Sequence, residues 1–242
     1  MLEYEFKAPC TNEQRLVADA ITQLDSLITL HQRKYDKLVQ TKKAMLDKMF
    51  PKPGELYPEI RFKGFTDPWE QRKLGDIASI QRGERFTAED YVSDDGIPCI
   101  HYGEIYTSYG ATATEAISRV REDLEPRLRF AKPGDIIIAS TSENVEDVCK
   151  AVAWLGKSQV AYHDDSFALS HSENSRYLVG YFETRAFCEQ KTRAVHGVKV
   201  MRVSSEALAN IDIPMAGRPE QDLIGRSLES LDSLITLHQR KP

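Results

Sequence analysis

Hydrophobic residues near the start of the chain recur with a seven-residue rhythm. The pattern is that of a coiled-coil helix, whose apolar stripe packs on a partner helix. It predicts a helix over residues 13–50, capped by Asn12 and stopped by Pro51. Such a helix would be about 57 Å long, too long to be stable alone in water. The stripe includes Val17, Ile21, Leu24, Leu27, Ile28, Tyr35, Leu38, Met45 and Met49.

The same pattern returns at the end of the chain. Residues 13–34 and 220–241 align at a constant offset of 207, and the last eleven residues of the two copies are identical. We therefore expect two like helices to bracket an unlike middle, with the second copy packing on the first. In the second copy the predicted packing residues are Leu231, Leu234 and Ile235. His31 and His238 share one seam-type position, either as a polar register device or as rings at a solvated edge.

The middle of the chain alternates short β-rich runs with glycine, proline, asparagine and aspartate, as strands joined by loops do. Aromatic residues at helical spacing predict a helix over residues 174–193, and a shorter helix is expected over Leu124–Phe130. Long loops at 82–97, 102–120, 140–150 and 194–199 would carry recognition. Strands are predicted at Asp76–Gln81, Pro98–His101, Asp135–Ala139, Ala151–Trp154, Gln159–Ala161, Ser166–Ser170, Val198–Val203 and Asp212–Pro214.

These patterns predict an α+β fold. One mixed α/β domain over residues 55–213 is flanked by long coiled-coil-forming helices in residues 1–54 and 214–242. With 242 residues, 41% of them hydrophobic, the chain can bury a full core. Its net charge of −5 mildly disfavours nucleic acid, although basic residues outnumber acidic ones between Arg33 and Lys48. Four scattered cysteines and no long apolar run predict a cytoplasmic protein with reduced thiols and no membrane span.

No catalytic motif stands out. The chain lacks a glycine-rich cofactor turn, an Asn-Pro-Pro-Tyr segment and a phosphate-cradling motif, which disfavours a methyltransferase or a nucleotide enzyme. The E-x-K triplet Glu189–Lys191 has the form used by metal nucleases, but it falls in a predicted helix rather than on a strand. The histidines of the middle region are isolated in sequence. We therefore expect no enzyme activity, no metal and no cofactor on this chain.

The loops instead carry residue types that read DNA. Arginine, lysine, asparagine and hydroxyl side chains bind base edges, and cations, tyrosines and hydroxyls hold phosphates. Several of these side chains are expected to line one DNA-facing surface. The candidates are Arg82, Arg85, His101, Tyr102, Thr107, Tyr109, Ser140, Thr141, Ser142, Asn144, His196, Lys199 and Arg202.

Three segments resemble a known family. Residues 58–83, PEIRFKGFTDPWEQRKLGDIASIQRG, resemble the opening of a target recognition domain in specificity subunits of type I restriction–modification systems. The stretch LDSLITLHQRKYDKLVQTKKAMLDKMFPK resembles the spacer helix of these subunits. The run VSSEALANIDIPMAGRPEQ resembles the exit from such a domain into the next spacer. The resemblance covers nearly the whole chain.

The resemblance implies a DNA-recognition subunit. Specificity subunits of this family hold two recognition domains apart with antiparallel spacer helices, and each domain reads one half of a bipartite target on double-stranded DNA. Two modification subunits dock on them, bring S-adenosylmethionine and methylate adenine, and restriction subunits can join. The specificity subunit itself does no chemistry. One domain would read about 3–5 base pairs.

The chain departs from this plan, because it holds one recognition domain and a second spacer that stops early. A half-length protein could form a head-to-tail homodimer with a two-fold-symmetric target. Alternatively, its helices could pair within one chain and leave about half of the first stripe exposed for another subunit. A different function also stays open. A truncated specificity protein could act as a regulatory or anti-restriction decoy that binds modification subunits through its helices without reading DNA.

Overall fold

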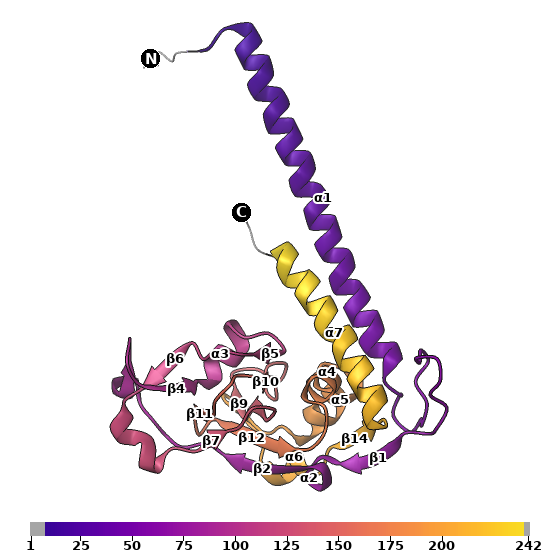
Figure 1. Cartoon of the computed structure of the whole chain (residues 1–242), viewed down its shortest axis with the longest axis vertical. Helices are drawn as coiled ribbons and strands as arrows, with labels where there is room; N and C mark the ends of the chain where they lie inside the picture. Colours follow the sequence, from indigo (N-terminus) through magenta and orange to yellow (C-terminus); the bar gives the residue numbers. More distant parts are fainter. Residues whose placement is uncertain (1–7, 240–242) are drawn as a thin grey trace.

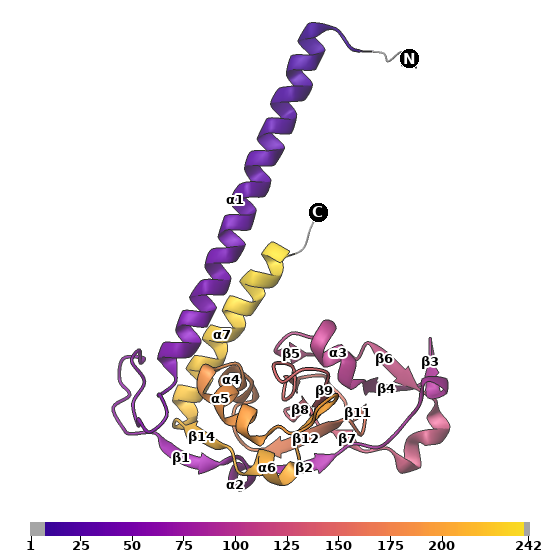
Figure 2. The same cartoon turned by 180° about the vertical axis from the view of Figure 1, so that it is seen from behind.

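A computed structural model describes residues 8–239 of the chain. The long helix α1 (Thr11–Met49) projects from one end of a mixed α/β domain, and α7 (Arg218–Gln239) returns along its domain-proximal half (Figures 1 and 2). The start of α1 therefore lies far from the domain, and the described part of α7 ends part-way along α1. No helix within residues 8–239 is long and apolar enough to cross a membrane. The expected α+β class, with helices flanking a sheet domain, is confirmed.

The domain between the two long helices contains four sheets. Its helices are α2 (Leu74–Ile77), α3 (Tyr102–Thr107), α4 (Ser175–Phe182), α5 (Arg185–Ala194) and α6 (Ser205–Ala209), with 3₁₀ turns η1 (Ala88–Asp90) and η2 (Glu122–Arg127). Its strands are β1 (Glu70–Lys73), β2 (Ala78–Arg82), β3 (Tyr91–Val92), β4 (Ile97–Ile100), β5 (Thr112–Ala113), β6 (Ser118–Val120), β7 (Phe130–Ala131), β8 (Ile136–Ala139), β9 (Thr141–Ser142), β10 (Ala151–Trp154), β11 (Val160–Tyr162), β12 (Ser166–His171), β13 (Met201–Arg202) and β14 (Asp212–Met215).

Two five-stranded sheets form the body of the domain. Their orders are β2-β12-β8-β10-β5 and β3-β6-β4-β11-β7, and the pairs β1-β14 and β9-β13 complete the set. The central strand β8 is buried at every position, as expected of an apolar run covered on both faces. The largest core joins this sheet to α4, α5 and the ends of α1 and α7. The second five-stranded sheet forms a separate lobe, away from the long helices (Figure 1).

The structure changes several predicted boundaries. Helix 174–193 is two helices, because Thr184 accepts a hydrogen bond from the Phe187 amide and caps a new start. The segment predicted as strand 76–81 begins with a helical turn, and only residues 201–202 of the segment 198–203 form a strand. The predicted loop 102–120 contains α3, β5 and β6, and residues 122–127 form a 3₁₀ turn. The long helix starts at Thr11 after Cys10, so Asn12 is not its cap.

Helices α1 and α7 run antiparallel, as the family resemblance implied. Lys42 of α1 pairs with Asp232 of α7 at 2.6 Å, and nearer the tip Gln239 donates to the Tyr35 hydroxyl at 3.0 Å. The rings of His31 and His238 lie 5.7 Å apart at the end of this contact. His31 is exposed and His238 half-buried, so these rings sit at a solvated edge rather than in a buried register layer.

The second copy of the repeat covers only part of the first. Tyr35 and Leu38 are half-buried against the rest of the chain, as are Leu231 and Ile235. The tip of α1 is not covered by α7, which is described to Gln239, level with Tyr35; this agrees with the alternative in which the helices pair within one chain and about half of the first stripe stays exposed. Leu234 also stays exposed, because it lies off the face that meets α1. The predicted packing residues left exposed on α1 are Val17, Ile21, Leu24, Leu27 and Ile28.

A buried carboxylate joins α7 to the segment that leads from α1 into the domain. Glu220 is 1% exposed in the first turn of α7. Its two oxygens accept from Nε and Nη2 of Arg61 at 2.8 and 2.9 Å, and Oε2 also accepts from the Trp69 indole at 3.1 Å. Trp69 packs in turn on Phe50 at the end of α1. The start of α7 and the end of α1 are therefore fixed to one point of the domain.

Candidate nucleic-acid interface

Three of the four loops selected from the sequence contact the turn 163–165, between β11 and β12, and the fourth is joined to one of them. The segment after β2 joins it through the β-bridge between Glu84 and His163. The backbone amide of Ser140 donates to the Asp165 carbonyl at 2.8 Å, and the His101 ring lies 5.4 Å from the His163 ring. The last loop arrives because β13 pairs with β9, placing Arg202 opposite Thr141. Segments more than a hundred residues apart thus form one surface.

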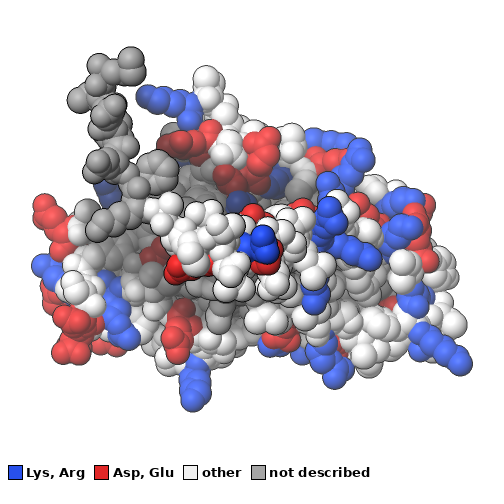
Figure 3. Space-filling view, turned by 90° about the horizontal axis from the view of Figure 1, so that it is seen from above, with Lys and Arg blue, Asp and Glu red and all other residues white. Residues whose placement is uncertain are grey.

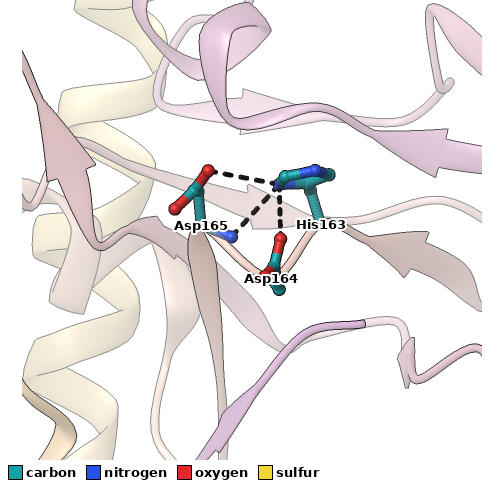
Figure 4. A group of neighbouring side chains, drawn as sticks. All are labelled: His163, Asp164 and Asp165. Carbon is teal, nitrogen blue, oxygen red and sulfur yellow. Dashed lines mark hydrogen bonds and ion pairs between the residues drawn. The ribbon is translucent and has the colours of Figure 1, made fainter. Parts of the chain in front are cut away.

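The imidazole of His163 is held in one tautomer. Its Nδ1 accepts a hydrogen bond from the Asp165 amide at 3.1 Å, so the proton must be on Nε2, which donates to the Phe86 carbonyl at 3.1 Å. The carboxylates of Asp164 and Asp165 lie 3.1 and 3.6 Å from Nδ1 (Figure 4). These three side chains could in principle converge on a cation, since their ligand atoms lie within 4.8 Å of one another. Because both ring nitrogens already serve the backbone, we assign no metal to this turn.

Gly83 allows the first loop to approach the turn. Its amide donates to the Ser166 carbonyl at 3.1 Å. A Cβ at this position would lie 2.2 Å from the His163 carbonyl oxygen and 2.4 Å from that of Tyr162. Any side chain would therefore push the flanking residues Arg82 and Glu84 away from the turn.

The comparisons with known proteins agree with this architecture. A sequence model of the family described as "Type I restriction modification DNA specificity domain" matches residues 66–242. The chain belongs to this family. The type I restriction enzyme MjaVIII specificity subunit of Methanocaldococcus jannaschii is 23% identical over an alignment of 243 residues. This alignment covers 96% of this chain and 56% of that protein.

Two solved structures share the fold of this specificity-family chain. The HsdS subunit from Thermoanaerobacter tengcongensis superposes with a TM-score of 0.61 at 17% identity, covering 96% of this chain and 53% of that one. A structure described for complex assembly and conformational transition of the type I R-M system gives 0.60 at 17% identity, covering 95% and 54%. The chain thus spans about half the length of the relatives it matches.

The structure divides the predicted DNA-binding residues of this specificity domain by accessibility. His101, Tyr102 and Tyr109 are half-buried. The hydroxyl-rich run Ser140–Ser142 is buried, because it passes under the last loop as β9 and its backbone joins both β13 and Asp165. These three side chains cannot reach a base in this conformation, which corrects the prediction for them. The exposed candidates are Arg82, Arg85, Thr107, Asn144, His196, Lys199 and Arg202.

Some candidates already serve the fold. The Nδ1 atom of His101 accepts from the Gly103 amide and caps α3, and burial, with a smaller contribution from His163, lowers the pKa of this histidine. The Tyr109 hydroxyl accepts from the Ile117 amide, and burial raises the pKa of Tyr109 to about 12. Asn144 exchanges hydrogen bonds with Asp147. These groups therefore shape the loops whether or not they also meet DNA.

Sequence reasoning missed the centre of the surface. His163 was taken only as one of the isolated histidines, and Asp164 and Asp165 were given no role, although a polar turn between two predicted strands was a usable signal. It also missed Val198, which lies at the tip of a tight hairpin and is 97% exposed. Two backbone hydrogen bonds between His196 and Arg202 close this hairpin at 2.8 and 3.0 Å. Gly197, with φ +136°, makes the turn.

Charge on this specificity domain is mixed rather than concentrated. Figure 3, which looks down the long helix, shows lysine and arginine interleaved with aspartate and glutamate on that face. Around the turn, Arg129 pairs with Glu84 at 2.8 Å, and Arg82 donates to the Asp164 carbonyl at 2.7 Å. Within residues 8–239, Arg85, Lys199 and Arg202 make no ion pair, so their charge is available to an anionic partner.

Proposed function

We propose that the chain is a sequence-specific DNA-recognition subunit of a type I restriction–modification system. It would read one half of a bipartite target on double-stranded DNA with the surface around the turn 163–165. The observation that carries this proposal is that three loops from distant parts of the sequence meet at that turn, with the fourth joined to them through the pairing of β13 with β9. The chain itself does no chemistry; S-adenosylmethionine belongs to the modification subunit, and the complex acts in the cytoplasm.

The residue types on the surface divide between two tasks. Arg85, Lys199 and Arg202 hold phosphates, because they are exposed cations without an ion pair among the described residues. Arg82 and the Asp164 carboxylate face base edges, where arginine donates to guanine and a carboxylate accepts from the cytosine amino group. Val198 supports readout of a thymine methyl group, since it is an apolar side chain at an exposed tip.

The two long helices would serve the docking of partner subunits. We infer that α1 and α7 form a rigid arm on which modification subunits dock and restriction subunits then join. Two contacts fix these helices to the domain and support this role: the pair between Glu220 of α7 and Arg61, and the 2.6 Å pair between Lys42 of α1 and Glu183. A docked methyltransferase must keep a set distance from the half-site. Because the surface charge is mixed and the net charge is −5, DNA affinity of the chain alone is weak and rises in the complex.

DNA affinity of the chain bound to its modification subunit tests the reading surface. Fluorescence anisotropy as a function of salt should show Arg85→Ala and Lys199→Ala each weakening binding and lowering the salt slope by about one. Arg185→Ala is the matched control, an exposed arginine on α5 with affinity expected to stay unchanged. Unchanged affinity and slope in both loop variants would refute the choice of surface.

Methylome sequencing of cells that carry the chain and a modification subunit tests the function as a whole. A new methylated motif is expected. Absence of any motif while the two proteins still co-purify would replace DNA reading by the decoy function, in which the helices occupy modification subunits without target recognition.

A further inference from the structure

A buried lysine lies behind the loop that joins β9 to β10. Lys191 belongs to the last turn of α5 and is 5% exposed. Its ammonium group donates hydrogen bonds to the backbone carbonyls of Glu146 at 2.6 Å and of Val148 at 2.7 Å. A buried ammonium group needs such acceptors, because a charge removed from water without them is costly. The lysine and the loop therefore depend on each other.

The helix that carries Lys191 is firmly anchored in the domain. Phe187, one turn earlier on α5, is 0% exposed and belongs to the largest core. The Gln190 side chain accepts from the Asp212 amide and donates to the Asp212 carbonyl, both at 2.9 Å, which ties α5 to β14. The core thus sets the position of the ammonium group, and the loop folds against a fixed point.

The loop, residues 143–149, is tightly folded around this ammonium group. Cys149 has φ +64°, a left-handed conformation that is uncommon for a residue with a side chain. Such a backbone persists only where the surrounding contacts hold it, and the Lys191 hydrogen bonds lie immediately before it. Asn144 and Asp147 close the other end of the loop with two hydrogen bonds of 2.8 Å. The loop therefore has one defined shape.

The outer side of the loop carries two exposed polar side chains, Glu143 and Asn144. They follow β9 directly, and β9 pairs with β13, so they leave the sheet beside the hairpin 196–202. After its bonds to Asp147, the Asn144 amide keeps a second N–H and a second lone pair. A donor and an acceptor on one amide are the groups that read adenine, and a carboxylate such as that of Glu143 accepts from the cytosine amino group.

We propose that Lys191 is a positioning residue for DNA recognition, which holds the loop 143–149 so that Glu143 and Asn144 face base edges of the half-site. The inference rests on the proposed function, because it assigns a role within the same reading surface. Lys191 itself does not reach DNA, since it is buried. Without its ammonium group two loop carbonyls lose their donor, and the loop samples other conformations. DNA then binds the fraction of chains with the loop in place, and the apparent Kd rises in inverse proportion to that fraction.

Hydrogen exchange of the full chain without DNA tests the first step. Lys191→Met removes the charge and the donors at similar side-chain length, so amides of the loop 143–149 should exchange about 10-fold faster, with β8 unchanged. Gln221→Met is the matched control, because it also removes a buried polar group bonded to the backbone, in α7 rather than behind the loop. Unchanged loop exchange in Lys191→Met, or an equal rise in the control, would overturn the proposal.

Chemical rescue keeps this step testable if the methionine variant does not fold. Lys191→Ala removes the atoms that propylammonium replaces. Added propylammonium should restore slow exchange of the loop 143–149, because it returns both the charge and the N–H donors. Tetramethylammonium at the same concentration carries the charge without a donor and should restore nothing. Equal effects of the two cations would contradict the assigned role of the ammonium group.

DNA binding of the chain in complex with its modification subunit tests the second step. One duplex carries the motif found by methylome sequencing, and a second duplex of equal length has that motif scrambled. Lys191→Met should weaken binding to the motif by about 10- to 100-fold, as expected when the loop is in place in about 1–10% of chains. Binding to the scrambled duplex should not change, because phosphate contacts dominate it. Gln221→Met should bind both duplexes like the wild type.

The DNA results separate two failures. If the wild-type complex prefers the motif but Lys191→Met binds it equally well, or loses affinity equally for both duplexes, Lys191 has no role in recognition and the inference is wrong. If the wild-type complex prefers neither duplex, the proposed function itself is refuted, and the recognition role of Lys191 with it.

Discussion

Replacing Glu220 tests how the helix pair is fixed to the domain. The carboxylate is 1% exposed and accepts three hydrogen bonds, two from the Arg61 guanidinium and one from the Trp69 indole. Glu220→Ala removes all three acceptor contacts at once. It also leaves the Arg61 side chain, only 15% exposed, as a charge without its partner.

The magnitude follows from that uncompensated charge. Removing one partner of a buried ion pair costs about 3–5 kcal/mol, mainly because the remaining group stays desolvated. For a chain of this size each kcal/mol lowers the melting temperature by about 2–4 °C, so a loss of about 6–20 °C is expected. Glu220→Gln keeps the shape of the side chain but removes its charge, so its melting temperature should lie between those of the wild type and Glu220→Ala. Adding Arg61→Met to Glu220→Ala should recover part of the loss, because no buried charge then remains.

Urea and thermal unfolding followed by circular dichroism measure these differences. The control is Glu229→Ala, which breaks the 2.7 Å pair with Arg176, whose side chains are 38% and 34% exposed. Solvent screens such a pair, so the expected loss is below about 1 kcal/mol. The reasoning fails if Glu220→Ala costs no more than this control, or if Arg61→Met makes the double variant less stable than Glu220→Ala.

Two further perturbations test the site and the pH response. Gly83→Ala should cost about 1–3 kcal/mol and weaken DNA binding, because its Cβ would overlap the backbone oxygens of Tyr162 and His163. Gly110→Ala, with open space around the residue, should change neither stability nor DNA binding, and equal effects of the two variants would contradict the argument. Burial lowers the pKa of His171, whose ring nitrogens have no hydrogen-bond partner among the described residues. The unfolded chain therefore takes up this proton first, so stability present above about pH 6.5 falls on acidification. Denaturant titrations from about pH 7.5 to 5.5 should show a shallower fall in His171→Gln, and an unchanged slope would refute it.

The two long helices and the family resemblance could be predicted from the sequence alone. Seam spacing and the 207-residue repeat are properties of neighbouring residues, and a helix buries its stripe through that local periodicity. They predicted α1, α7 and their mutual packing, and the segments around Trp69 and Ile213 carried the resemblance to specificity subunits. Strands β8, β10 and β12 were also predicted closely, because each carries an unbroken run of three or four apolar residues.

Only the tertiary structure decided where the repeat has a partner and which loop residues are accessible. Leu24 and Leu231 have the same sequence neighbours towards the chain end, yet one is bare and the other half-buried, because burial depends on how far the opposing helix reaches. Backbone pairing also decides the accessibility of two loop segments: it buries Ser140–Ser142 and leaves Val198 exposed. The serines are covered because β9 pairs with a strand some sixty residues away, and Val198 is exposed because the bridge between His196 and Arg202 holds it at the tip of a hairpin. Backbone pairing and the reach of the opposing helix set these outcomes, and the pattern of residue types along the chain does not encode them.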